Sequence, residues 1–318
     1  MLRATRILCP VDFSEPSAYA LRQALGLAAA WRVPLHVLTV LDEPKRHLHA
    51  RPLDADDFQQ AEDAVRRFVQ EQMPPVATWD AETQISVRVG SPGEEIVRTL
   101  RDVPAEMLVI GTRGRTGVRK WLFGSTCERL LRLPPCNILA VSGPEHPIAP
   151  LVATRPVVQL RRVLVATDFG ADSLLAVRAA AEFAASYGAE LFVVHVMARP
   201  TVYAVPGEAP LVVADNQDAI DAAEQDLKAC LAQVGSQGTV TPLLLEGTAY
   251  LEIAYAAEHH HADLVVMGAT GCGGGHHRLT GLTTYGVASH TRCPVLVLPA
   301  LRQVEAAFNT SMSVPVTA

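Results

Sequence analysis

Aromatic side chains and charges are scarce in this sequence, and long apolar runs are missing. Aromatic residues make up 5% of the 318 positions and charged residues 19%, against a usual charged share of ~25%. No apolar run approaches the ~18–20 residues that cross a bilayer, so we expect no membrane span. Hydrophobic residues still reach 49%, with a mean hydropathy of +0.18, which excludes disorder for most of the chain. These values indicate many short buried strands, as in a parallel sheet covered on both faces.

Neither the net charge nor the cysteines point to a special class of protein. The net charge is −6 and the pI is about 6.0, so no general attraction for nucleic acid or acidic membranes is expected. The six cysteines form no C-x-x-C pair, which argues against a zinc ribbon or a disulfide framework. Asp12 interrupts the first apolar stretch, so we predict no secretory signal and a cytoplasmic location.

The chain contains an internal repeat. Arg6–Phe13 (RILCPVDF) recurs as Arg162–Phe169 (RVLVATDF), at an offset of 156 residues. From Gly90 and Gly247 onward the offset becomes 157. A repeat this long predicts two copies of one domain, each with its own core, and not a solenoid. The expected division is a first domain over residues 1–142, a proline-containing linker over 143–160, a second domain over 161–300 and a tail over 301–318.

Short apolar runs alternate with helical patterns in both copies, which we call the first and second halves. The strands expected in the first half are residues 7–11, 35–41, 85–89, 107–110 and 138–141. Those expected in the second half are residues 163–167, 191–196, 240–245, 264–267 and 295–298. This alternation predicts an α/β fold with a doubly wound, five-stranded parallel sheet in each half. Ser91–Glu94 (SPGE) further predicts a capping box with proline at the first helical position.

Unusual residues follow the first and fourth strands, where open α/β sheets bind ligands. Asp12 and Asp168 come after the first strands. The fourth strand of the first half leads into a loop from Gly111 to Gly124 that contains Gly114, Arg113, Arg115, Arg119 and Lys120. Ser125 and Thr126 then open a helix, whose N-terminus favours anions. The loop therefore predicts a phosphate site, and Asp12 a partner for a sugar hydroxyl or a base amine.

The chain resembles the universal stress protein family. The resemblance rests on Val11–Ser14 (VDFS), Leu35–Val40 (LHVLTV) and the spacing G-x2-G-x9-G-S that ends at Ser125. It covers nearly all of both halves, which indicates a tandem form. It implies the sheet order 3-2-1-4-5 of adenine nucleotide alpha hydrolase-like folds, with the halves joined through their fifth strands as an intramolecular pseudo-dimer. It also implies ATP as ligand, with Mg or Mn held through the phosphates.

The family's ATP contacts can be carried over position by position. In the first half they fall on Asp12, Val40, Gly111, Gly114, Gly124 and Ser125. The cationic loop adds Arg113 and Arg115, and the start of the following helix adds Thr126. In the second half they fall on Asp168, Val196, Gly268, Gly271 and Gly281. Leu282 stands in the place of Ser125, and Thr283 is the nearest hydroxyl. Two unequal nucleotide sites are therefore predicted.

No catalytic or metal-binding side chains are predicted. The sequence lacks G-x4-G-K-[ST] and has no G-x-G-x-x-G after the first strand. No general base or second Mg²⁺ carboxylate is evident, so at most slow ATP hydrolysis is expected. The leading hypothesis is an ATP-binding stress-response or signalling module with unidentified protein partners, which can also form a homodimer of the two-domain chain. The alternatives are a nucleotide-hydrolysing or adenylate-transferring enzyme, and a scaffold for a lipid or an AMP-like ligand.

Several histidines and cysteines receive weaker interpretations. His259–His261 lie at the C-terminal end of an expected helix. Charged histidines there interact favourably with the helix dipole, and we prefer this interpretation to a metal site. His276 and His277 lie in the second glycine loop and are either nucleotide contacts or simply exposed. His36 and His195 are interpreted as packing positions. Cys136 and Cys293, at equivalent positions before the fifth strands, are interpreted as packing residues, with redox sensing as the alternative.

Overall fold

A computed structural model describes residues 2–41, 53–75, 77, 82–112, 124–152, 154–198, 217–234, 238–270 and 282–300. The strands of the first half are β1 (Ile7–Pro10), β2 (Leu35–Leu41), β3 (Thr83–Val89), β4 (Met107–Gly111) and β5 (Asn137–Val141). Its helices are α1 (Glu15–Trp31), α2 (Ala55–Gln72), α3 (Pro92–Asp102) and α4 (Ser125–Arg132). The strands of the second half are β6 (Arg162–Ala166), β7 (Glu190–Met197), β8 (Val240–Glu246), β9 (Leu264–Gly268) and β10 (Val295–Leu298). Its helices are α5 (Ala171–Tyr187), α6 (Gln217–Ala232), α7 (Ala249–His259) and α8 (Leu282–His290).

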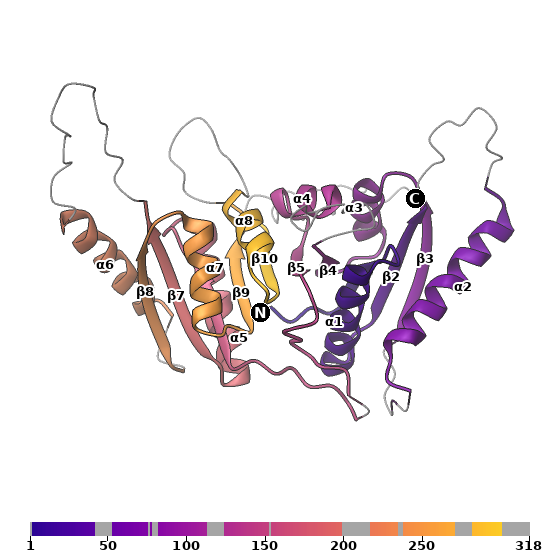
Figure 1. Ribbon diagram of the computed structural model, residues 1–318, viewed down its shortest axis with the longest axis horizontal. Helices are drawn as coiled ribbons and strands as arrows, with labels where there is room; N and C mark the ends of the chain where they lie inside the picture. Colours follow the sequence, from indigo (N-terminus) through magenta and orange to yellow (C-terminus); the bar gives the residue numbers. More distant parts are fainter. Residues whose placement is uncertain are drawn as a thin grey trace, which may run out of the picture.

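The strands form one continuous ten-stranded sheet in the order β3-β2-β1-β4-β5-β10-β9-β6-β7-β8. Neighbouring strands are parallel within each half, and β5 and β10 pair antiparallel where the halves meet. Each half therefore has the order 3-2-1-4-5, as the resemblance implied, and the fold prediction is confirmed. Figure 1 shows the halves side by side, with α2 and α6 at the two outer ends. None of the described helices is long and apolar enough to cross a membrane.

The two halves are related by a pseudo-twofold axis that is visible in their contacts. At the central strand pair Leu139 faces Leu296, its own equivalent at the offset of 157. On one face of the sheet, the ends of α1 and α5 meet, and Trp31 Nε1 donates a 2.9 Å hydrogen bond to the hydroxyl of its equivalent, Tyr187. On the other face α4 contacts α8. Apolar clusters on both faces include buried residues from both halves, so the halves share their packing.

Edge position explains the proline in β8. Pro242 lies within that strand and faces Val193 of β7. Because β8 is the outermost strand of its half, the missing N–H of Pro242 costs no ladder hydrogen bond on the open side. In the first strand, Pro10 is the last residue of β1, where the strand is about to end.

The predicted capping box at α3 is wrong. Ser91 is the N-cap residue and Pro92 begins the helix, as expected, but the Ser91 side chain makes no capping hydrogen bond. Glu94, which would complete the box, points instead to Arg129 of α4, with a distance of 3.5 Å between Nη1 and Oε1. Glu94 therefore makes a tertiary ion pair in place of the predicted local hydrogen bond to the backbone.

The proline-containing segment between the halves packs against α1. Gln23 binds this segment twice, donating to the carbonyl of His146 at 3.2 Å and accepting from the N–H of Ile148 at 3.1 Å. A Cβ added to Gly26 would lie 2.0 Å from the carbonyl oxygen of Ala149, so the segment rests directly on the helix backbone. Ile148 and Ala149 are buried. The connection is therefore part of the core and not only a spacer.

Candidate functional site

The carboxyl ends of β1 and β4 are neighbours, and there the direction of chain progression across the sheet reverses. We call this place the switch point of the first half. Asp12 follows β1, and its Oδ1 accepts hydrogen bonds from the N–H of Ser14, at 3.1 Å, and from the Ser14 hydroxyl. Ser14 is in turn the N-cap residue of α1. The carboxylate of Asp12 is therefore held at a defined place beside the switch point.

Packing accounts for one of the predicted glycines. A Cβ on Gly111, the last residue of β4, would lie 2.7 Å from the carbonyl oxygen of Pro16. The two ends of the following loop are hydrogen-bonded to each other: the N–H of Gly124 donates to the carbonyl of Thr112 at 3.1 Å. Gly111 is thus required for the close approach of β4 to α1. Arg113, Gly114 and Arg115, predicted between these ends, lie outside the described residues.

The N-terminus of α4 begins at the base of this loop. Gly124 is its N-cap residue, and the first helical hydrogen bond runs from the N–H of Glu128 to the Gly124 carbonyl. Ser125 is exposed and Thr126 half-buried. The first-turn N–H groups of a helix have no intrahelical acceptor, and with the helix dipole they create a local positive potential. Both hydroxyls therefore lie where an anion would be favoured.

The second half has the same framework at the carboxyl ends of β6 and β9. Asp168 Oδ1 accepts hydrogen bonds from the N–H of Gly170, at 3.1 Å, and from the Ser173 hydroxyl, at 2.6 Å. Leu282 replaces Ser125 at the start of α8 and is 40% exposed. The next residue, Thr283, is exposed too. Gly271, Gly281, His276 and His277 lie outside the described residues.

The residue before Val40 differs from the residue before Val196, its equivalent in the second half. In the first half, the hydroxyl of Thr39 donates to the carbonyl of Val11 at 3.0 Å. In the second, His195 Nδ1 lies 2.8 Å from the carbonyl of Thr167. Because a carbonyl only accepts, Nδ1 carries the proton there. Alignment of the two halves pairs Thr39 with His195, so the sequence already carried the signal that this histidine replaces a hydrogen-bonding residue.

The ring of His195 also stacks on Phe169, with 4.3 Å between ring centroids and 29° between the planes. Phe169 directly follows Asp168 and has the positive φ of 62° that Phe13 has in the first half. Phe13 instead packs edge-on against Phe68 of α2. An aromatic pair therefore lies beside the aspartate in both halves, but only in the second half is it a stacked pair that includes a histidine from the neighbouring strand.

The remaining histidines and cysteines give no second centre among the described residues. Burial raises the pKa of Cys136 and of Cys293 to about 12, which favours the packing interpretation. His260 caps α7. The described part of the chain contains no group of three or more His, Cys, Asp or Glu suited to a metal ion.

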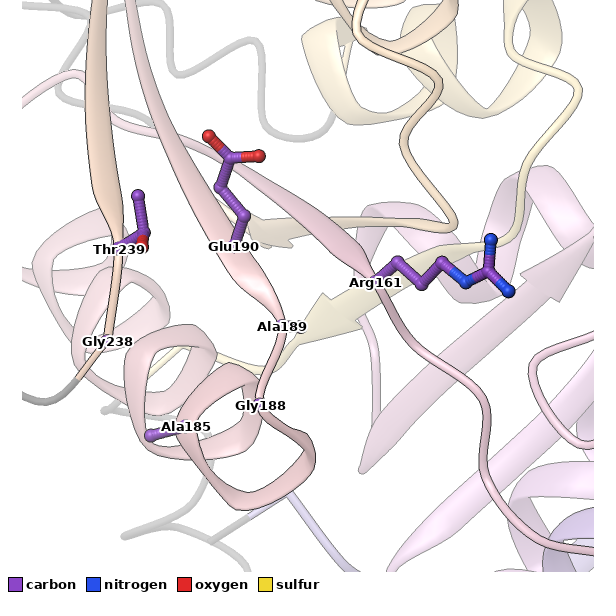
Figure 2. Close-up of a pocket in the computed structure, with 7 residues that line it drawn as sticks. All are labelled: Arg161, Ala185, Gly188, Ala189, Glu190, Gly238 and Thr239. Carbon is purple, nitrogen blue, oxygen red and sulfur yellow. The ribbon is translucent and has the colours of Figure 1, made fainter.

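A cavity of about 520 Å³ lies at the opposite edge of the second half, where β6, β7 and β8 begin. Its lining residues are Arg161, Ala185, Gly188, Ala189, Glu190, Gly238 and Thr239. The side chains of Arg161 and Glu190 point in different directions (Figure 2), so the two charges do not converge on a common ligand. Parallel sheets bind ligands at the carboxyl ends of their strands, and the switch points remain the better candidate sites.

Comparison with known proteins bears on both halves. The pattern of the Universal stress protein family is matched twice, by residues 4–142 and by residues 159–299. A universal stress protein of Methanocaldococcus jannaschii is 27% identical over 148 residues, which cover 44% of this chain and 83% of that protein.

Two solved structures resemble the whole chain. A universal stress protein from Archaeoglobus fulgidus aligns with a TM-score of 0.63 and 21% identity, over 93% of this chain and 98% of that one. A Pseudomonas aeruginosa protein of unknown function aligns with a TM-score of 0.63 and 18% identity, over 98% and 99%. At these identities the likeness concerns the fold, and its extent includes both halves.

Proposed function

This chain belongs to the universal stress protein family as a tandem form, and on that premise we propose that it binds ATP at the switch point of its first half. Binding would serve a stress-response or signalling role and not a metabolic reaction. The adenine amine would face the Asp12 carboxylate and the backbone of Val40. The phosphates would face the glycine loop, Ser125, Thr126 and the first turn of α4, with Mg or Mn bound through the phosphates.

One observation carries this proposal. Asp12 and the first turn of α4 belong to the loops that follow two neighbouring strands, β1 and β4. An oriented carboxylate acceptor and an anion-favouring helix end therefore lie at the same switch point. An adenosine phosphate has a hydrogen-bond donor at one end and negative charge at the other, which matches this polarity.

Binding without rapid turnover is favoured over an enzymatic role. Hydrolysis needs a group that positions or deprotonates water beside the γ-phosphate. Glu128, three residues after Ser125 in the sequence, is the carboxylate in the first turn of α4. Its Oε1 accepts a 2.8 Å hydrogen bond from Arg132 Nη2. Asp12 is already bound by Ser14. Neither is arranged as a general base, so we expect slow hydrolysis at most.

The test exchanges residues between the halves of the full chain. Ser125→Leu places the second-half residue in the first site, and we expect ATP affinity to fall about tenfold or more, because a hydrogen bond to a charged group contributes ~1.5–3 kcal/mol. The control is Asn137→Ala, a half-buried position outside the switch point. ATP affinity is measured by calorimetry, and retained ligands by mass spectrometry of denatured protein.

Three results would count against the proposal. They are an absence of any ATP binding, an equal ATP affinity in the wild type and Ser125→Leu, and ATP turnover at tens per second. The last result would support the enzymatic alternative. Release of a lipid in place of a nucleotide would support the scaffold alternative.

A further inference from the structure

The two switch points differ in one side-chain contact: in the second half, a carboxylate from one loop binds a residue of the other loop. In the second half, the Asp172 carboxylate accepts a hydrogen bond from the hydroxyl of Thr270. Asp172 lies in the first turn of α5, after β6, and Thr270 lies two residues beyond the end of β9. The interaction therefore ties together the two loops between which a nucleotide would sit, and it puts a negative charge at the start of the second glycine loop.

The equivalent positions of the first half carry neither residue. Pro16 corresponds to Asp172 and Arg113 to Thr270. The first turn of α1 does contain an acidic side chain, Glu15, but its carboxylate accepts from the hydroxyl of Tyr19, one turn further along the same helix. The difference thus lies in the direction of the carboxylate: along the helix in the first half, and across the switch point in the second.

The positive charge that would offset a triphosphate is also lower in the second half. The first loop, residues 111–124, contains Arg113, Arg115, Arg119 and Lys120, whereas residues 268–281 contain Arg278 alone. The described segments 167–173, 264–270 and 282–287 hold no Lys or Arg. ATP carries about four negative charges, and close like charges repel strongly where solvent screening is reduced.

Groups that can recognise a base are retained in the second half, although most of the positive charge is not. Asp168 is held by Gly170 and Ser173 as an oriented acceptor. The stacked pair of Phe169 and His195 flanks it, and aromatic faces suit planar heterocycles. At the start of α8, Leu282 offers an apolar side chain where the first half has a serine.

From these differences, and resting on the proposed function for the choice of adenine, we propose that the second switch point binds adenosine without its phosphates. Asp168 would accept from the exocyclic amine. Asp172, tied to Thr270, would exclude the triphosphate. The chain would then hold two chemically different ligands, a triphosphate in its first half and an uncharged nucleoside in its second.

Calorimetry of the full chain with ATP and, separately, with adenosine tests this. For ATP we expect one strong site per chain, weakened about tenfold or more by Ser125→Leu and unchanged by Asp168→Asn. For adenosine we expect a site weakened about tenfold by Asp168→Asn and left within twofold by the control Asn137→Ala, which lies outside both switch points. Asparagine keeps one acceptor oxygen for the helix N-terminus but replaces the other by a donor that faces the adenine amine.

Asp172→Asn isolates the charge, because it keeps an acceptor for Thr270. We expect a second ATP site to appear, with affinity raised about tenfold over the wild-type second half and adenosine affinity unchanged. Two wild-type ATP sites of equal affinity would overturn the inference, as would adenosine binding insensitive to Asp168→Asn or an Asp172→Asn variant with no gain in ATP affinity. If ATP binds nowhere while adenosine depends on Asp168, the proposed function of the first half fails and the inference stands.

Discussion

The two halves share a backbone plan but differ at solvent-exposed positions of their third helices, α3 and α7. The outer face of α3 carries Glu94, Arg98 and Asp102, whereas the equivalent positions of α7 carry Leu251, Tyr255 and His259. Leu251 is 44% and Tyr255 62% exposed. Most sheet positions behind these helices remain apolar in both halves, and buried His36, equivalent to Phe192, is an exception. The two copies therefore keep the apolar character of most sheet positions, while the exposed helix positions have changed in polarity.

The halves also show a large-for-small exchange between neighbouring helices. In the first half Gly93 of α3 lies under Arg129 of α4, and in the second Tyr250 of α7 lies over Gly286 of α8. These are equivalent positions at the offset of 157. In each half the same space is filled by the large side chain of one helix, which is the opposite helix in the other half. Replacing one residue of a pair by its equivalent is therefore expected to destabilise the fold, whereas replacing both should destabilise it less.

The largest expected effect concerns the axis pair of Trp31 and Tyr187. Trp31 is 4% exposed and also packs edge-on against Phe183, so Trp31→Ala is expected to cost ~3–5 kcal/mol of unfolding free energy. Tyr187→Ala removes a less buried ring and should cost less. Urea unfolding of both single variants and the double variant measures the coupling. Equal losses of unfolding free energy in the two single variants would contradict this explanation by the difference in burial of the two rings.

The next effect concerns the exchange at α7 and α8. A Cβ on Gly286 would lie 2.6 Å from the ring of Tyr250, so Gly286→Ala is expected to cost ~1–3 kcal/mol through overpacking. Adding Tyr250→Gly should relieve the clash. In the first half, Arg129→Ala loses only an exposed ion pair with Glu94 and should cost ~0–1 kcal/mol. A double variant less stable than Gly286→Ala would rule out this explanation.

A smaller effect distinguishes the halves by pH. Burial lowers the pKa of His36, and the charges of Arg6 and Arg88 act in the same direction. The unfolded chain, with a histidine pKa near 6.5, then binds more protons, so stability should fall as the pH drops below that value. The equivalent residue is Phe192, and His36→Phe should flatten the dependence of the thermal midpoint between pH 7 and pH 5. An unchanged slope would exclude His36 as its source.

The smallest effect concerns the equivalent cysteines. With pKa values of about 12, Cys136 and Cys293 should both react slowly with a maleimide at pH 8 in the folded chain and rapidly in urea, since the thiolate reacts. Peptide mass spectrometry after timed labelling measures each site separately. Fast labelling of only one of the two cysteines would contradict the packing interpretation for that residue and would support the redox alternative.

Local pattern and family resemblance together predicted most of the fold. The expected strands match all ten observed strands, with differences of at most two residues at their ends. The central strands were predicted from short apolar runs because a strand buried on both faces needs such a run, whereas the edge strands β3 and β8 are only half-buried. For the candidate site, strand-end positions and the family resemblance predicted Asp12, Gly111 and Ser125, and their binding roles stay a prediction. The role of Gly111 in admitting the backbone of Pro16 could not be predicted, because it depends on a contact between separate elements.

By itself, then, the sequence determined the duplication, the alternation of strands and helices and the residues at the strand ends. Only the tertiary structure decided which groups meet across the chain. It paired Glu94 with Arg129 in place of a capping box, seated the linker on Gly26, joined Trp31 to Tyr187 and turned Asp172 toward Thr270. The physical reason is that periodicity reports which face of each element is buried, whereas a hydrogen bond or an ion pair depends on which two surfaces packing brings together.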